Sequence, residues 1–323
     1  MYSSPWMYKV LVRVFLQQTN MKKLSNFLSF FIVLNLSLSA LAQDNLYPRQ
    51  ILNLSTDERV STNALLADKS KRQLSVIDSK CMLDGTVKEQ YNIDIGKKSG
   101  DKKSRDDRRT PEGMYILLER KTPPEIPFDT YGSVAFTTNY PNYFDKYDNK
   151  TGSGIWLHSV PDKIPLTRGS RGCVVLRNDD IKKIESAIML KKTFLVIDNK
   201  IVWIPKEEHQ KEKDFAVNWL ENWRLQWESQ DIDKYIQNYS DEFKSPPFNK
   251  KTWFTHKQKL KEKYKFVKLQ LSDPNIFQVK KQYIFQFVQN YESSDHKDVG
   301  LKTLYVLKEG NSMKITREEW SAL

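Results

Sequence analysis

The spacing of apolar residues changes near residue 205, and this change constrains the fold more than any other feature. Upstream, short apolar runs such as Met114–Glu119 and Thr193–Ile197 are separated by Gly, Pro, Asp and Asn, a pattern typical of β-strands. Downstream, aromatic residues recur every four positions from Phe215 to Trp227, as on one face of a helix. The sequence therefore predicts a mostly β domain over residues 63–205 and an α+β domain over residues 214–323.

Each domain has further predicted elements. A helix is expected over residues 178–190, where Asn178 or Asp179 caps an apolar repeat. In the second domain the first helix is expected to start near Asp214, and its aromatic residues are expected to pack in a core. Two more helices should follow over residues 232–239 and 249–264, and then strands at 266–271, 276–279, 282–291, 301–308 and 313–316. The charged stretch 206–213 lacks an apolar period, so it predicts a linker in which His209 is solvated.

The N-terminal 42 residues have the features of a targeting segment. A basic start at Met21–Lys23 precedes an apolar core over residues 27–41, and Ala40 and Ala42 supply small residues at the two positions that a signal peptidase reads. The sequence predicts export to the periplasm or cell envelope with cleavage after Ala42; an uncleaved anchor is the alternative. Met21 is the expected start of the protein, and residues 1–20 otherwise extend the basic region. The polar residues 43–62 form an N-terminal arm that is a candidate for homodimerisation.

The charge of the chain excludes one class of partner. The net charge is +12 and the isoelectric point is near 9.3, which favours anionic surroundings. Basic and acidic residues alternate in Lys97–Arg109, unlike the continuous basic stripe of nucleic-acid-binding proteins. This segment is either a solvated loop or a weak attractor for a carboxylate-rich polymer. No group of His, Cys and Asp has metal-ligand spacing, so neither a metal nor another cofactor is indicated.

The residues with the clearest chemistry are His158 and Cys173, fifteen positions apart. A cysteine attacks as its thiolate, and a nearby imidazole can accept the thiol proton. The turn from Ser170 to Cys173 contains Gly172, and its backbone N–H groups could bind a developing oxyanion. Considered singly, either residue is more simply explained as part of a core.

The second cysteine, Cys81, is expected to be packed and separate from Cys173. It lies in a predicted hairpin over residues 80–85, whose Asp-Gly turn should hold it away from the His-Cys pair. A disulfide between the two would block the nucleophile. Two free thiols are therefore expected, one reactive and one buried.

Three phrases in order resemble the L,D-transpeptidase (YkuD-type) family. They are Ala64–Ser79 (ALLADKSKRQLSVIDS), Thr110–Tyr115 (TPEGMY) and Ile155–Asn178, which carries Ser-Arg-Gly-Cys in place of the common Ser-His-Gly-Cys. The resemblance implies a β-sandwich or barrel with a short helix after the cysteine loop. The second domain resembles the nuclear-transport-factor-like (NTF2-like, or SnoaL-like) cone, a fold with a pocket that is a candidate site for a peptide or glycan ligand.

The resemblance also assigns roles to individual residues. Cys173 would be the nucleophile, His158 the general base and acid, and Gly172 part of the oxyanion loop. Ser170 and Arg171 would border the substrate cleft, and Trp156 would either wall it or pack in the core. Tyr131 and Tyr140 are candidates for a lid.

The implied substrate is a peptidoglycan stem peptide, cleaved between the L-centre of its diamino acid and D-Ala. The acyl-enzyme could react with water, as in L,D-carboxypeptidases that set cell shape, or with an amine, as in L,D-transpeptidases that form cross-links or attach proteins. A sortase would place its His much farther from its Cys, and a papain-like protease would place Cys before His. A non-catalytic wall-binding protein that uses the cone is the alternative from another class.

Overall fold

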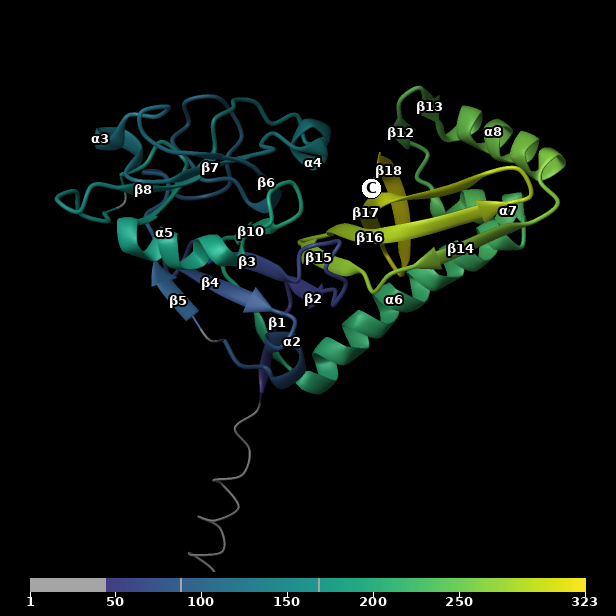
Figure 1. Cartoon of the computed structure of the whole chain (residues 1–323), viewed down its shortest axis with the longest axis horizontal. Helices are drawn as coiled ribbons and strands as arrows, with labels where there is room; N and C mark the ends of the chain where they lie inside the picture. The colour runs from purple at the N-terminus through teal and green to yellow at the C-terminus, as the bar shows by residue number, and fades with distance from the viewer. Residues whose placement is uncertain (1–44, 88, 168) are drawn as a thin grey trace, which may run out of the picture. The chain divides into compact units, whose positions relative to one another are not determined.

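The computed structural model describes residues 45–87, 89–167 and 169–323. The predicted signal peptide, its cleavage site at Ala42 and the expected start at Met21 lie outside the described residues. Within the described ranges, no helix combines the length and apolar character needed to span a bilayer. Residues 45–323 form one unit of structure, whose two larger sheets have eight and six strands and are accompanied by helices (Figure 1).

The first sheet has eight strands in the order β5-β4-β3-β10-β6-β7-β8-β9. The pairs β3–β10 and β8–β9 are parallel and the others are antiparallel. Beyond β5, Asp94 and Val175 exchange backbone hydrogen bonds of 2.8 and 2.9 Å, so the sheet nearly closes on itself. The strands are β3 (Asn63–Asp68), β4 (Gln73–Asp78), β5 (Glu89–Asn92), β6 (Gly113–Lys121), β7 (Ala135–Thr138), β8 (Trp156–Val160), β9 (Val174–Arg177) and β10 (Phe194–Asp198).

Alternate side chains of these strands fill the interior of the first domain. Leu65, Tyr115, Leu157, Leu176 and Leu195 are fully buried in one cluster. This confirms the predicted mostly β fold. The helix expected over residues 178–190 is shorter, because α5 (Asn178–Ile184) continues only as a 3₁₀ turn, η1 (Glu185–Ala187), before the chain becomes extended. Two short helices, α3 (Phe128–Tyr131) and α4 (Tyr143–Tyr147), lie in the loops.

The second domain is the predicted α+β cone. Its sheet has the order β18-β17-β16-β15-β2, with β14 also paired to β16. Trp223 and Trp227 are buried in its core, as predicted, whereas Phe215 is exposed. The elements are α6 (Lys206–Glu228), α7 (Ile232–Tyr235), η2 (Ile236–Asn238), β12 (Lys244–Ser245), β13 (Phe248–Asn249), α8 (Lys250–Lys263), β14 (Val267–Leu271), β15 (Asn275–Val279), β16 (Gln282–Ser293), β17 (Lys297–Glu309) and β18 (Ser312–Ala322).

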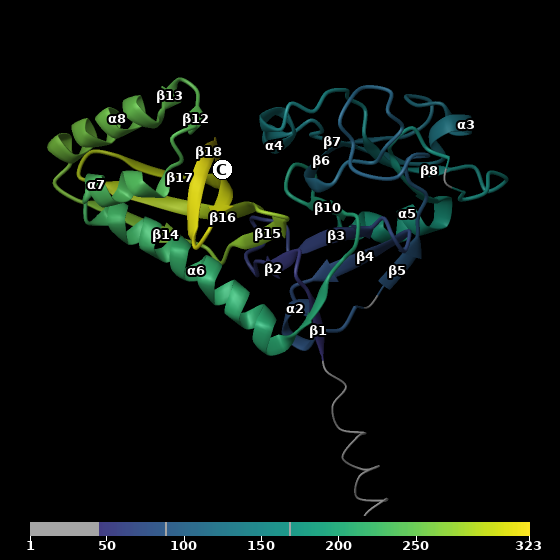
Figure 2. The ribbon, with the colours of Figure 1, turned by 180° about the vertical axis from the view of Figure 1, so that it is seen from behind.

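The prediction of a linker over residues 206–213 is wrong, because α6 begins at Lys206. Glu207 and Glu208 lie in its first turn, where negative charge stabilises a helix N-terminus. His209 is 4% exposed, not solvated; its Nε2 lies 2.9 Å from the carbonyl oxygen of Ile51 and its ring stacks on Tyr47 at 5.1 Å. The helix contacts β2 and β11 (Trp203–Pro205) near one end and β14 near the other, as both ribbon views show (Figures 1 and 2).

The N-terminal arm contributes strands to both parts of the molecule. Its first strand, β1 (Leu46–Pro48), pairs with β11, and its second, β2 (Ile51–Asn53), pairs with β15 at the edge of the cone sheet. One apolar cluster contains residues of the arm, such as Ile51, and of both domains. Within it the ring centroids of Phe194 and Phe277 lie 4.6 Å apart. Both strands of the arm have partners within the chain, and dimerisation through it stays a prediction.

Cys81 lies in a short helix, α2 (Cys81–Asp84), and not in the expected hairpin. Gly85 ends this helix with φ 70°, so the Asp-Gly pair forms a helix C-terminus. Cys81 and Cys173 form no disulfide, and Cys81 is buried while Cys173 is half-buried. The expectation that the two cysteines stay unbridged is confirmed.

Candidate active site

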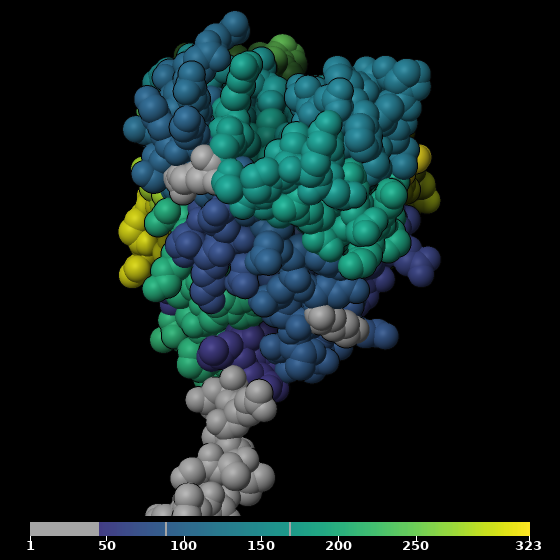
Figure 3. Space-filling view, turned by 90° about the vertical axis from the view of Figure 1, so that its left-hand side faces the viewer, coloured from purple at the N-terminus to yellow at the C-terminus, as the bar shows by residue number. Residues whose placement is uncertain are grey.

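Neighbouring parallel strands place His158 and Cys173 on one face of the first sheet. His158 on β8 is paired with Val175 on β9, and Cys173 lies directly before β9, two positions from Val175. Side chains directly opposite in a parallel pair share a face, and residues two apart on one strand share it too. Trp156 and His158 therefore lie on the same face as Cys173. In Figure 3 the face of the molecule turned to the viewer is formed largely by this first domain, in blue and teal.

The imidazole of His158 is held in one tautomer. Its Nδ1 lies 2.6 Å from the carbonyl oxygen of Ser159, which can only accept, so Nδ1 carries the proton and Nε2 has a free lone pair. Burial lowers the pKa of His158 to about 4, and the hydrogen bond to Ser159 opposes this only in part. His158 is therefore a neutral base at pH 7, with Nε2 available to accept a proton.

The thiol of Cys173 is hydrogen-bonded to the backbone just before β8. Its Sγ donates to the carbonyl oxygen of Gly154 at 3.5 Å. Burial raises the pKa of Cys173 to about 11, opposed in part by the backbone N–H of Trp156 and by the Lys102 ammonium. The free site thus favours a neutral thiol, whose proton is directed at Gly154.

Hydrogen bonds within the loop hold Ser170, Gly172 and Cys173 together. The Ser170 hydroxyl donates to the carbonyl oxygen of Cys173 at 2.8 Å and accepts from the Gly172 N–H at 3.0 Å. Gly172 has φ 134°, and a Cβ there would lie 2.7 Å from the Arg109 carbonyl oxygen and 2.8 Å from Ile155 Cδ1. Glycine is thus required for close backbone packing, and Ser170 shapes the loop.

A segment that sequence reasoning missed supports the same loop. Asp94 accepts from the Gly169 N–H at 2.9 Å and from Arg72 at 2.8 Å. Three residues later, the Lys97 N–H donates to the Ser170 carbonyl oxygen at 2.9 Å. The only sequence signal for this role was the polar Asp94 within an otherwise apolar run.

Aromatic rings line the site beside His158. Tyr131, at the end of α3, packs at 4.9 Å from the ring of Trp156 and edge-on at 5.1 Å from His158. The positive charge of Arg171, which is exposed, acts to lower the pKa of Tyr131, although burial raises it overall. Tyr140 is buried against Tyr115, and its hydroxyl donates to the Thr151 carbonyl oxygen, so its prediction as a lid residue is wrong.

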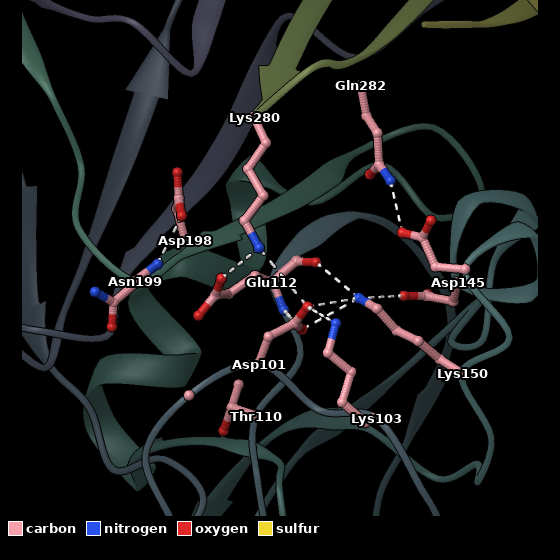
Figure 4. Close-up of polar contacts among 12 residues, drawn as sticks. Asp101, Lys103, Thr110, Glu112, Asp145, Lys150, Asp198, Asn199, Lys280 and Gln282 are labelled. Carbon is pink, nitrogen blue, oxygen red and sulfur yellow. Dashed lines mark hydrogen bonds and ion pairs between the residues drawn. The ribbon is translucent and has the colours of Figure 1, made fainter.

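Glu112 of the TPEG phrase is a buried carboxylate that forms an ion pair with Lys69. Lys69, from the first phrase, donates to Glu112 at 3.0 Å and to the carbonyl oxygens of Gly100 and Thr110 at 2.8 Å each. These three bonds use all its protons, so a buried ammonium is fully paired. The Thr110 hydroxyl accepts from the Gly96 N–H at 2.8 Å, directly before Lys97. Figure 4 shows Glu112 with Asp101 and Lys150, further charged residues around it.

A pocket of about 670 Å³ is lined mainly by β16–β18 and by the β12–α8 region of the cone, together with Ile116 and Lys191 of the first domain. On its wall, Gln286 is 1% exposed, and neither amide atom has a hydrogen-bond partner in the described part of the chain. Lys302 and Glu318 form an ion pair of 2.8 Å at the same wall. Buried polar groups without partners favour a polar occupant.

Comparison with known proteins matches both domains. Residues 62–204 match the L,D-transpeptidase catalytic domain family (YkuD), and residues 216–319 match the Cds6 C-terminal NTF2-like domain. The structure of Bdellovibrio bacteriovorus Bd1075 is 48% identical, with a TM-score of 0.79, covering 86% of this chain and 99% of that one. The helical cell shape determining protein Pgp2 from Campylobacter jejuni is 27% identical, with a TM-score of 0.62, covering 88% of this chain and 98% of that one.

No curated protein sequence matches the chain. The family matches cover both domains, and the Bd1075 match extends over nearly the whole length of that protein. The chain belongs to the L,D-transpeptidase (YkuD) family, with a peptidoglycan-directed catalytic domain followed by a C-terminal NTF2-like domain.

Proposed function

We propose that the protein is a cysteine-dependent L,D-carboxypeptidase that trims tetrapeptide stems of peptidoglycan to tripeptides. The observation that carries this proposal is the placement of Cys173 and His158 on one face of paired strands, with Nε2 of His158 free to accept a proton. The similarity along both domains to Pgp2, a helical cell shape determining protein, supports this proposal, because the sequence resemblance links cell-shape members of the family to L,D-carboxypeptidase activity.

Acylation follows from the site geometry. Substrate displaces the thiol of Cys173 from Gly154, and His158 Nε2 takes its proton as Sγ attacks the carbonyl carbon between the diamino acid and D-Ala. The Cys173 N–H stabilises the oxyanion, while the Gly172 N–H keeps the loop in place through Ser170. The C–N bond then breaks, His158 returns the proton to the departing amine, and D-Ala leaves with a thioester on Cys173.

The charge around the site favours water as the second nucleophile. Arg171 is exposed on the cysteine loop, whereas the Lys102 ammonium, which acts on the Cys173 sulfur, is already paired with Asp107 at 2.8 Å. The Arg171 guanidinium attracts stem carboxylates and repels the ammonium form of an acceptor amine, whereas water is neutral. Water activated by His158 attacks the thioester, releases the tripeptide carboxylate and restores the thiol.

The test is product mass from disaccharide tetrapeptide incubated with the wild-type protein and with Cys173→Ala. The expected product has lost one D-alanine residue, which is released as free D-alanine, and the variant should yield none. Cross-linked dimers would instead identify a transpeptidase. Identical behaviour of the two proteins would leave the non-catalytic wall-binding alternative as the better account.

We further propose that the pocket of the cone binds a peptide or glycan portion of the same polymer. The unpaired amide of Gln286 and the Lys302–Glu318 pair support a polar ligand. Titration of Cys173→Ala with disaccharide tetrapeptide should give a Kd that rises at least about tenfold in Cys173→Ala/Gln286→Leu, since an amide that pairs with ligand is worth about 1.4 kcal/mol. An unchanged Kd would exclude the pocket.

Export to the periplasm through a signal peptide cleaved after Ala42 is part of the proposal. The basic start and apolar stretch of residues 21–42 support it. N-terminal sequencing of the protein recovered from the cell envelope should begin at Gln43. A first residue at Met1 or Met21 would instead indicate an uncleaved anchor.

A further inference from the structure

The hairpin between β15 and β16 carries an unusual lysine at its tip. Val279 pairs with Gln282, so the turn consists of Lys280 and Lys281 alone. Lys280 has φ 57°, a left-handed conformation that glycine or asparagine adopts at lower cost. A lysine at this position indicates that its side chain contributes something that those residues cannot.

That side chain reaches the catalytic domain. Nζ of Lys280 lies 2.8 Å from one carboxylate oxygen of Glu112 and 3.7 Å from Asp101. The other carboxylate oxygen of Glu112 accepts from Lys69 at 3.0 Å. Figure 4 shows Lys280 descending from the cone hairpin onto Glu112, so this carboxylate is held between lysines of the two domains.

Lys280 also balances a cluster of buried charge. Asp101, Glu112 and Asp145 are mostly buried, and Lys150 pairs with both aspartates at 3.1 Å. With Lys69, the cluster has two buried ammonium groups against three carboxylates, and Lys280 supplies a third ammonium from the solvent side. The Lys280 side chain is 58% exposed, close to the 62% of Lys103, but Lys280 contacts buried Glu112 at 2.8 Å whereas Lys103 contacts Asp101 at 3.3 Å. Without Lys280 the three carboxylates would face only two buried ammonium groups, which is unfavourable.

A short series of hydrogen bonds connects the segment around Glu112 to the loop 169–173, which carries Cys173. Thr110, two residues before Glu112, binds the Gly96 N–H, and the next N–H in the chain, that of Lys97, binds the Ser170 carbonyl oxygen. Ser170 in turn donates to Cys173. On the same stretch as Glu112, the Arg109 carbonyl packs against Gly172.

We propose that Lys280 is a positioning residue through which the NTF2-like domain holds the cysteine loop in its reactive geometry. Its ammonium holds Glu112 in position by an ion pair, and Glu112 in turn holds the segment that contains Thr110. That segment positions residues 96–97 through the Thr110 hydroxyl, and residues 169–173 are held by Lys97 and by packing against Arg109. The catalytic domain is on this account incomplete without the hairpin of the second domain. The proposal rests on the proposed catalytic function for its kinetic readout only.

The test compares Lys280→Met with Lys280→Arg and with Lys281→Met in the full chain. Lys281 is the matched control, because it belongs to the same turn and its side chain is exposed. Lys280→Met should lower kcat on disaccharide tetrapeptide about tenfold with KM changed less than about twofold, a size typical of coupling through packed networks. Lys280→Arg should restore most of kcat, and Lys281→Met should match the wild type.

Hydrogen exchange followed by mass spectrometry supplies a readout that needs no substrate. In Lys280→Met, peptides covering residues 94–97 and 169–173 should exchange about tenfold faster, while β17 and β18 keep the wild-type rate. Faster exchange throughout the protein would mean general destabilisation and would overturn the proposal, as would unchanged exchange in the two peptides. If the wild-type protein has no peptidase activity, the proposed function fails and the exchange rates alone decide the role of Lys280.

Discussion

Replacing Gly172 by alanine tests the packing of the nucleophile loop most directly. The new Cβ would lie 2.7 Å from the Arg109 carbonyl oxygen and 2.8 Å from Ile155 Cδ1, in a backbone conformation of φ 134°. The backbone conformation costs about 1–3 kcal/mol. Overpacking against a backbone oxygen adds about 1–3 kcal/mol. We expect Gly172→Ala to lower the free energy of unfolding by about 3–4 kcal/mol.

Gly310→Ala is the matched control for this substitution. Gly310 has φ 60°, and a Cβ there would meet no atom within 4 Å, so only the backbone conformation costs energy, about 1 kcal/mol. Urea unfolding followed by circular dichroism measures both variants, and kcat at a temperature where both are folded measures the loop. Equal losses of stability in the two variants, or full kcat in Gly172→Ala, would refute the close packing inferred for Gly172.

Three further predictions follow from the site. The pKa of His158 near 4 and that of Cys173 near 11 predict that kcat/KM is flat from about pH 5 to 9, falling only as His158 is protonated below that range; a midpoint near 6.5, the pKa of an unshifted imidazole, would contradict the effect of burial on His158. Lys69→Met should lower the free energy of unfolding by about 3–5 kcal/mol, because it leaves the buried Glu112 with only the exposed Lys280 as partner, whereas exposed Lys103→Met should change it by under about 0.5 kcal/mol in the same urea titration. Asp94→Ala should cost about 2 kcal/mol and lower kcat, because the Gly169 N–H loses its acceptor; unchanged thermal unfolding would contradict this.

The sequence predicted those features that depend on local pattern. Strand alternation and the aromatic repeat up to Trp227 depend on neighbours a few positions away, so both domains could be anticipated. The first turns of α6 could not, because the burial of His209 depends on Ile51 and Tyr47, more than 150 positions earlier. Glu112 could be recognised as part of the TPEG motif, but its two lysine partners could not, because they come from distant segments, one of them in the other domain.

The chemistry of the site could likewise be predicted only in part from the sequence. The types and spacing of His158 and Cys173 predict a nucleophile and a base, because few other pairs of side chains perform this reaction. Whether Cys173 carries a proton in the free site depends on its burial and on its side-chain rotamer, which places the thiol against the Gly154 carbonyl oxygen. Neither quantity is encoded in a short window of sequence.

The edge position of β2 has a consequence for how the protein is assembled. Residues 51–53 are among the first that the ribosome makes in the described chain, yet they pair with β15, which is made more than 200 residues later. The cone cut out as a separate fragment would expose the unpaired backbone of β15, a surface prone to aggregation. Gene fusions that exchange one half for a homologue's half must therefore carry residues 45–62 along with the cone.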